Sequence, residues 1–216
     1  EAEAFLGREF KQAVENERLG LENHPLTRNL QLEWARMLAR KGDYEGAVFQ
    51  MGEVLEWWTK ISNSGPGEEH INTLIPRWRL GWVNLEYFFH TDEEKQPERR
   101  AALMERSLEL YSGVVEQMEK TYGYENLNTL QAKTGYGILL TVLGRSDESL
   151  AMARDTYDQK KKTLGRYNTS TLISLRALYE ATGDKAKAFK KRGDVERAAV
   201  LFREVADLQL QAVESQ

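Results

Sequence analysis

The stretch GYENLNTLQAKTGYGILLTVLGRSDESLA, residues 123–151, decides the fold. A polar loop opens it, apolar residues at helical spacing follow, and a glycine at 144 precedes a second amphipathic segment. Gly123 suits the end of one helix, and Asn126 is placed to cap the next by accepting from its free N–H groups. The stretch therefore predicts a hairpin of two helices and no β-strand.

The opening loop recurs along the chain. Its counterparts are the segments 20–27, 67–73 and 165–171, each of which ends in a threonine. Successive threonines lie 46, 56 and 42 residues apart, and the excess in the longest interval falls at 90–100, a polar stretch. The residues expected to cap the helix after each loop are His24, His70, Asn126 and Asn168.

Small residues recur at fixed distances from these landmarks. Eight positions after the threonine stand Ala35, Gly81 and Gly137. A glycine inside a helix costs about 1 kcal/mol relative to alanine, so we expect a packing reason, the close approach of a second helix. The small residues five places after a turn glycine are Ala47, Ser149, Ala188 and Ala198. Each unit is therefore predicted to be two antiparallel helices, A and B, closed by a small-on-small contact.

The predicted helices cover 5–19, 26–41, 44–61, 70–90, 98–121, 128–143, 147–163, 170–182 and 194–213. Two alternatives stay open for 184–192, because Gly183 and Gly193 both fit the last turn: the A helix runs on, or a short extra helix intervenes. The unpaired first helix suggests a cap or a fragment of a longer array.

Residues 1–4 have the sequence expected of an expression scar from a yeast secretion leader, and we set them aside. The rest, 5–216, is predicted to be a single repeat domain. Its expected units are a half repeat at 5–19 and full units at 20–66, 67–122, 123–164 and 165–216.

Composition narrows the function classes. The 216 residues carry a net charge of −4 and no cysteine, which disfavours a general nucleic-acid binder and excludes thiolate metal sites and a cysteine nucleophile. The sequence contains no run of 18 apolar residues, so it predicts no membrane-spanning helix. Glu86 and His90 share a helix face, but no pair of Glu-x-x-His motifs, P-loop or nucleophile elbow accompanies them. We expect no catalytic residue, metal site or cofactor.

The repeat pattern resembles the tetratricopeptide repeat (TPR), in the 42-residue form of kinesin light chains. The Gly…His-Pro-x-Thr loop, the small residue eight after the threonine and the Gly-x-x-x-x-Ala turn carry the resemblance, which covers about 20–213. The fourth unit departs from it, since Arg176 or Tyr179 occupies the usual small position. The resemblance implies an all-α, right-handed α-solenoid of antiparallel helix hairpins, with A helices lining a concave groove that binds peptide segments of other proteins.

The resemblance also implies where a peptide would bind. The groove positions carried over from the family are Arg36, Arg40, Trp78, Trp82, Thr134 and Ile138. Trp78 and Trp82 are four residues apart on one helix face, and beside two arginines they would form a hot spot for an extended peptide with an apolar anchor and a carboxylate. The alternative is that one or both tryptophans pack in the core or under the insertion at 90–100.

Two functions are compatible with these sequence features. The first is a non-catalytic protein–protein interaction scaffold that binds a peptide in the groove. The second is a structural or self-associating repeat segment of a larger multidomain sensor or ATPase-type protein, with no groove ligand. We expect protein or peptide partners and no nucleic acid. Two further alternatives stay open: the chain forms a homo-oligomer, or it is part of a larger chain. The expected location is the cytoplasm, and secretion is the alternative.

Overall fold

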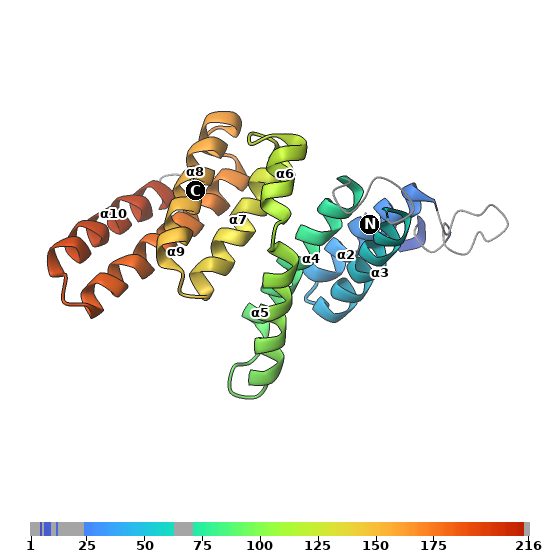
Figure 1. Cartoon of the computed structure of the whole chain (residues 1–216), viewed down its shortest axis with the longest axis horizontal. Coiled ribbons are helices and arrows are strands. Elements are labelled where there is room, and N and C mark those ends of the chain that lie inside the picture. Colours follow the sequence, from blue (N-terminus) through green and yellow to red (C-terminus); the bar gives the residue numbers. More distant parts are fainter. Residues whose placement is uncertain (1–4, 6, 10–11, 13–23, 63–70, 214–216) are drawn as a thin grey trace. The chain divides into compact units, whose positions relative to one another are not determined.

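The computed structural model describes residues 5, 7–9, 12, 24–62 and 71–213, and over these residues the chain forms helices and no strand (Figure 1). The predicted helix at 5–19, the loops at Gly20 and Gly67, and the cap at His70 lie largely outside the described residues. The chain divides into two compact units, one ending at Val114 and the other beginning at Val115, and each is described by itself.

The first unit is a series of helices that pack on their neighbours in sequence. Its helices are α2 (Pro25–Arg40), α3 (Tyr44–Ser62), α4 (Ile71–His90) and α5 (Pro97–Tyr111). Helix α3 contacts both α2 and α4, and α4 contacts α5. The buried side chains that join them include Leu32, Met51, Val54, Trp58 and Leu80.

The second unit repeats this arrangement. It holds most of α6 (Val114–Tyr122) and all of α7 (Leu127–Val142), α8 (Ser146–Leu164), α9 (Thr169–Lys191) and α10 (Val195–Val213). Each helix from α7 to α10 contacts the next, and α7 also contacts α9. Its core includes Leu150, Tyr157, Leu175, Leu178 and Leu208. The predicted all-α fold of stacked helix hairpins is confirmed.

The predicted caps and turns have the expected local geometry. The side chains of His24, Asn126 and Asn168 each accept a hydrogen bond from the backbone N–H two residues on, at 3.2, 2.9 and 2.9 Å. The hairpin turn after α7 has Gly144 at φ +72°, a left-handed conformation that side-chain-bearing residues rarely adopt. Polar caps and turn glycines thus set the helix boundaries that the loops predict.

The small residues lie where the helices of a hairpin approach each other. Ala35 and Ala47 are completely buried. In the α4/α5 and α7/α8 hairpins a serine hydroxyl on the B helix donates to the carbonyl of the A-helix glycine: Ser107 to Gly81 at 3.0 Å and Ser149 to Gly137 at 3.1 Å. The predicted small-on-small contact is present in these two hairpins, where a serine–glycine hydrogen bond forms it.

The helix predicted over 98–121 is broken in two. Helix α5 ends at Tyr111 and α6 begins at Val114. Between them, Ser112 has an extended ψ of 115° and Gly113 has φ +75°, so the backbone leaves the helical region for two residues. The prediction missed this break because the apolar spacing continues through it.

The A helix of the last unit runs on past its predicted end at 182. Helix α9 extends to Lys191 and the turn falls at Gly193, with Gly183 inside the helix. This decides between the two alternatives for 184–192. Ala186 is completely buried seven residues before the turn glycine, the same distance that separates Ala35 from Gly42. In this unit the small residue, Ala186, is found by counting seven positions back from the turn glycine, Gly193. Counting eight positions forward from Thr171 reaches Tyr179 instead.

Two glycine-to-alanine substitutions test the close approach. A Cβ on Gly81 would lie 3.0 and 3.1 Å from ring carbons of Tyr111, a fully buried side chain, whereas a Cβ on Gly137 would meet Met152 at an ordinary 3.7 Å. We expect Gly81→Ala to lower the free energy of unfolding by about 1 kcal/mol or more and Gly137→Ala to raise it by about 0.5–1 kcal/mol. Urea denaturation measures both values. A free energy of unfolding that changed in the same direction in both variants would contradict this account.

Candidate functional site

Four of the six predicted groove residues belong to the first unit, where α2 and α4 present polar side chains on a common face. Arg36 is half-buried and Arg40 exposed on α2, and Trp82 is half-buried on α4. The fourth, Trp78, is only 7% exposed. We call the group Glu33, Arg36, Arg40, Arg79, Trp82 and Glu86 the α2/α4 face.

Glu33 ties the two helices together. One of its carboxylate oxygens accepts from Arg36 at 2.5 Å on the same helix, and the other accepts from Arg79 of α4 at 3.1 Å. Burial lowers the pKa of Arg79, as does the charge of Arg36, while Glu33 opposes the shift. Glu33 is shared between two guanidinium groups, so this part of the face has an excess of positive charge.

Trp82 lies between the core and this polar face. Its ring packs against the apolar cluster of the first unit, and its indole N–H donates to Glu86, one turn further along α4. Burial raises the pKa of Glu86, and the hydrogen bond from Trp82 and the charges of His90 and Arg40 oppose this shift. The indole is half-exposed and lies one turn from Glu86, whose carboxylate is also close to the charges of His90 and Arg40.

Trp78 is not part of the exposed surface around Trp82, and the insertion at 90–100 does not cover that surface. Trp78 is buried, so the core interpretation holds for it. The insertion packs at the carboxyl end of α4: Arg100 donates to the carbonyls of Phe88 and Thr91 at 3.0 and 2.9 Å, and its guanidinium lies over the Phe88 ring. These contacts begin more than a turn beyond Trp82.

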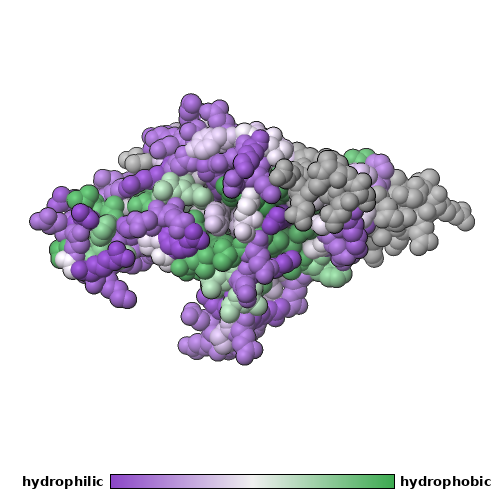
Figure 2. All heavy atoms as spheres, in the orientation of Figure 1, coloured by the Kyte–Doolittle hydropathy of each residue, from purple (hydrophilic) through white to green (hydrophobic). Residues whose placement is uncertain are grey.

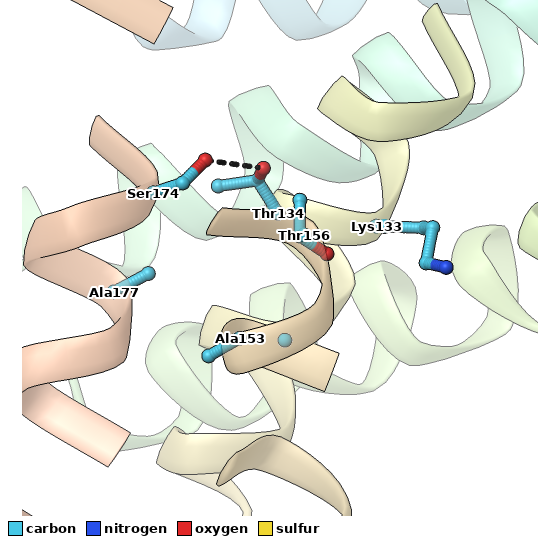
Figure 3. Close-up of a pocket in the computed structure, with 7 residues that line it drawn as sticks. Lys133, Thr134, Ala153, Thr156, Ser174 and Ala177 are labelled. Carbon is cyan, nitrogen blue, oxygen red and sulfur yellow. Dashed lines mark hydrogen bonds between the residues drawn. The ribbon is translucent and has the colours of Figure 1, made fainter. Parts of the chain in front are cut away.

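In the second unit, Thr134 and Ile138 lie on α7, buried and half-buried respectively. The Thr134 hydroxyl donates to the carbonyl of Leu130 at 2.8 Å and lies 3.3 Å from the hydroxyl of Ser174 on α9 (Figure 3). It also accepts from Lys160 of α8 at 2.8 Å. Thr134 is therefore engaged by three helices of the fold itself.

A narrow cleft surrounds this cluster. It is lined by Lys133, Thr134, Gly137, Ala153, Thr156, Ser174 and Ala177, and it has no room for a water molecule. Figure 3 shows Thr134 and Ser174 directed toward each other and Lys133 directed away from Ser174. The cleft is a packing seam between helices rather than a ligand pocket.

Lys160 is the most perturbed cation of this region. Its side chain is almost completely buried, and burial lowers its pKa from 10.5 to about 8. The ammonium donates to Thr134 and, at 3.5 Å, to the carbonyl of Ser170, and its pKa shift includes no contribution from a carboxylate. A lysine with a lowered pKa can serve as a nucleophile or base. This one is almost completely buried, and its ammonium is hydrogen-bonded to Thr134 and to the carbonyl of Ser170, so the geometry gives it a packing role.

Metal and membrane features are absent from the part of the chain that the structure describes. Within it, no group of three or more His, Asp or Glu side chains is arranged to hold a metal ion. Nor does any described helix combine the length and apolar character that crossing a bilayer requires.

Sequence reasoning missed two members of the α2/α4 face, Glu33 and Arg79, which form an ion pair with each other. A signal for Glu33 was present, because it stands three and seven residues before Arg36 and Arg40, a spacing that puts all three on one helix face. The pairing of Glu33 with Arg79 has no such signal in the sequence. The two residues are 46 positions apart, and they meet only because α2 and α4 pack with these side chains close together.

Comparison with known proteins supports the fold. No protein-family model matches the sequence, and no curated protein sequence matches it significantly. Among solved structures, the TPR-like repeats of a kinesin light chain from Podosopora anserina align with 96% of this chain and 92% of their own, at 19% identity and a TM-score of 0.56. A single-residue variant of those repeats aligns with 99% of this chain and 87% of its own, at 20% identity and a TM-score of 0.62.

These similarities extend over nearly the whole chain and agree with the repeated caps, turn glycines and small-residue contacts described above. Identities near 20% establish the architecture rather than a shared activity. In fold, this chain is a TPR-like helical repeat protein of the kind found in kinesin light chain repeats.

Proposed function

We propose that this chain is a non-catalytic interaction scaffold whose α2/α4 face binds an acidic peptide segment with one apolar anchor. The observation that carries the proposal is a half-exposed tryptophan beside Glu86, a carboxylate that is also close to the charge of exposed Arg40. Tryptophan and arginine are the residue types most enriched in interface hot spots. The TPR-like fold supports it, because such repeats generally serve as protein-interaction scaffolds.

The chemistry of the face defines the peptide. The half-exposed edge of the Trp82 indole offers apolar area to a Leu or Phe side chain. Arg36 shares Glu33 with Arg79 and has a side chain 41% exposed, and Arg40 is also exposed, so both guanidinium groups retain N–H donors for a carboxylate. Both features lie within one unit.

Fluorescence anisotropy with labelled acidic peptides that carry one Phe or Leu tests the proposal. We expect Trp82→Ala to weaken binding about tenfold or more, the size of a hot-spot truncation. Arg36→Gln and Arg40→Gln should each weaken it several-fold and reduce its sensitivity to salt.

Arg106→Gln is the matched control, because Arg106 is an exposed arginine on α5 that pairs with Glu109 away from the α2/α4 face. It should bind peptides as the wild type does. If Trp82→Ala and Arg36→Gln both retained wild-type affinity while the control did so as well, the α2/α4 face would not be the binding site.

A further inference from the structure

The charges of the α2/α4 face follow a regular order along its two helices. A carboxylate oxygen of Glu33 on α2 lies 3.1 Å from the guanidinium of Arg79 on α4. Seven residues further along each helix, the charge of Arg40 lies close to Glu86, so the two contacts are about two turns apart and their signs are exchanged. Trp82 lies between these contacts, three residues after Arg79 and four before Glu86. The tryptophan therefore has one charged contact on either side of it.

The two sides of Trp82 differ in net charge. Arg36 also pairs with Glu33, so on the first side two guanidinium groups share one carboxylate. On the second side Arg40 and His90 lie close to Glu86, and a histidine is largely neutral above pH 7. A ligand carboxylate therefore meets an excess of positive charge on the Arg36 side. On the Arg40 side it competes with Glu86, and Arg40 offsets only part of that repulsion.

Glu86 stays beside Trp82 whether or not Arg40 pairs with it. Glu86 is half-buried, and the indole N–H of Trp82 donates to it. Its charge also acts on Tyr44 of α3 and Tyr111 of α5, so the carboxylate lies near the contacts of α4 with both helices. Arg40 is exposed, and an exposed arginine loses side-chain entropy when it is held in one ion pair. The negative charge is therefore the fixed member of this contact.

The loop after α4 brings no net positive charge to the Glu86 side. Over residues 91–100, four acidic residues are opposed by three basic ones. Residues 92–94 have the sequence Asp-Glu-Glu and are all exposed, and Lys95 and Arg100 pair with the first two, at 3.1 and 3.8 Å. Figure 2 shows mainly hydrophilic side chains at this lower end, below the α5 label of Figure 1.

We propose that Glu86 sets the specificity of the α2/α4 face by excluding ligand carboxylates from the Arg40 side of the apolar anchor. This inference rests on the proposed function, because it concerns the same peptide. A group that repels the wrong ligand determines specificity as much as one that attracts the right ligand. The peptide that binds best therefore carries acidic residues on one side of its anchor only, the side that reaches Arg36.

Fluorescence anisotropy above pH 7 with three labelled peptides tests the proposal. Each peptide carries one Phe, with Asp residues before it, after it or on both sides. The wild type should bind one of the two one-sided peptides about threefold to tenfold more tightly than the other, and acidic residues on both sides should add no affinity. In Glu86→Gln the two one-sided peptides should differ by less than about twofold, and the two-sided peptide should bind most tightly.

Glu109→Gln is the matched control, because Glu109 is an exposed carboxylate on α5 that pairs with Arg106 away from the α2/α4 face. It changes the net charge of the protein by the same amount as Glu86→Gln and should keep the wild-type ranking of the peptides. Circular dichroism should show every variant to be equally helical.

Three outcomes would overturn the proposal: a wild type that binds the two-sided peptide most tightly, a wild type that binds the one-sided peptides equally, or a Glu86→Gln variant that keeps the wild-type ranking. If Trp82→Ala still weakens the binding of these peptides, the proposed function stands and only the role of Glu86 is wrong. If the binding of none of them depends on Trp82, both are wrong.

Discussion

Replacing Lys160 by methionine is expected to stabilise the protein by about 2 kcal/mol at pH 7. The wild-type ammonium is buried without a carboxylate contribution, and its pKa falls from 10.5 to about 8. Each pKa unit of depression corresponds to about 1.4 kcal/mol. Methionine fills a similar volume without a charge, and the loss of two hydrogen bonds, to Thr134 and Ser170, offsets part of the gain.

The sign of the pH dependence follows from the direction of the shift. Between the folded pKa of about 8 and the unfolded value of 10.5, the unfolded chain binds a proton at Lys160 that the folded chain does not. Stability due to this group therefore rises with pH, by about 2 kcal/mol from pH 7 to 9.5. The advantage of Lys160→Met should shrink by the same amount over that interval.

Urea denaturation of both proteins at several pH values below 9.5 measures this difference. The upper limit avoids tyrosine ionisation. Burial raises the pKa of Tyr122 from 10.0 to about 12, so above pH 10 the unfolded chain loses this proton first and the contribution of Tyr122 to stability falls as the pH rises. Lys161→Met is the control, since its side chain is exposed on the same helix. A Lys160→Met variant that is less stable than wild type at pH 7, or whose advantage does not change with pH, would refute the account.

The fold was predictable because its signals are local. A polar residue before each helix, a glycine after it and a small residue at a fixed position occur at regular intervals, and the caps at Asn126 and Asn168 form as predicted. The break at Gly113 was missed because a left-handed glycine between two apolar turns does not disturb their periodicity.

The candidate site was predictable only in part. Arg36, Arg40 and Trp82, which the resemblance to the tetratricopeptide repeat implied as groove positions, lie on the α2/α4 face. The burial of Trp78 was not predictable, because two tryptophans four residues apart look alike in a sequence and differ only in what packs against each. The triple engagement of Thr134 likewise depends on contacts among three helices.

Lys133, in the same unit, is a buried lysine whose ammonium is paired with carboxylates, unlike that of Lys160. Its side chain is only 6% exposed, but its ammonium contacts Asp155 of α8 at 2.6 Å and Glu119 of α6 at 2.9 Å, and it lies over the Tyr124 ring. Removing one partner of a buried ion pair leaves the other uncompensated. Lys133→Met should therefore destabilise the protein, even though it is the same substitution that stabilises it at Lys160.

We expect Lys133→Met to lower the free energy of unfolding by about 2–3 kcal/mol, less than for a fully buried pair because Glu119 and Asp155 are 35 and 37% exposed. The loss arises from two carboxylates left facing each other, so it should diminish as the pH falls toward about 4 and they take up protons. Lys162→Met serves as the control, since Lys162 pairs with Glu125 in a solvent-exposed contact and should cost less than about 0.5 kcal/mol. Equal losses at Lys133 and Lys162 in urea denaturation would show that burial does not decide the strength of these pairs. A loss at Lys133 that persists unchanged at low pH would point to lost packing rather than to charge.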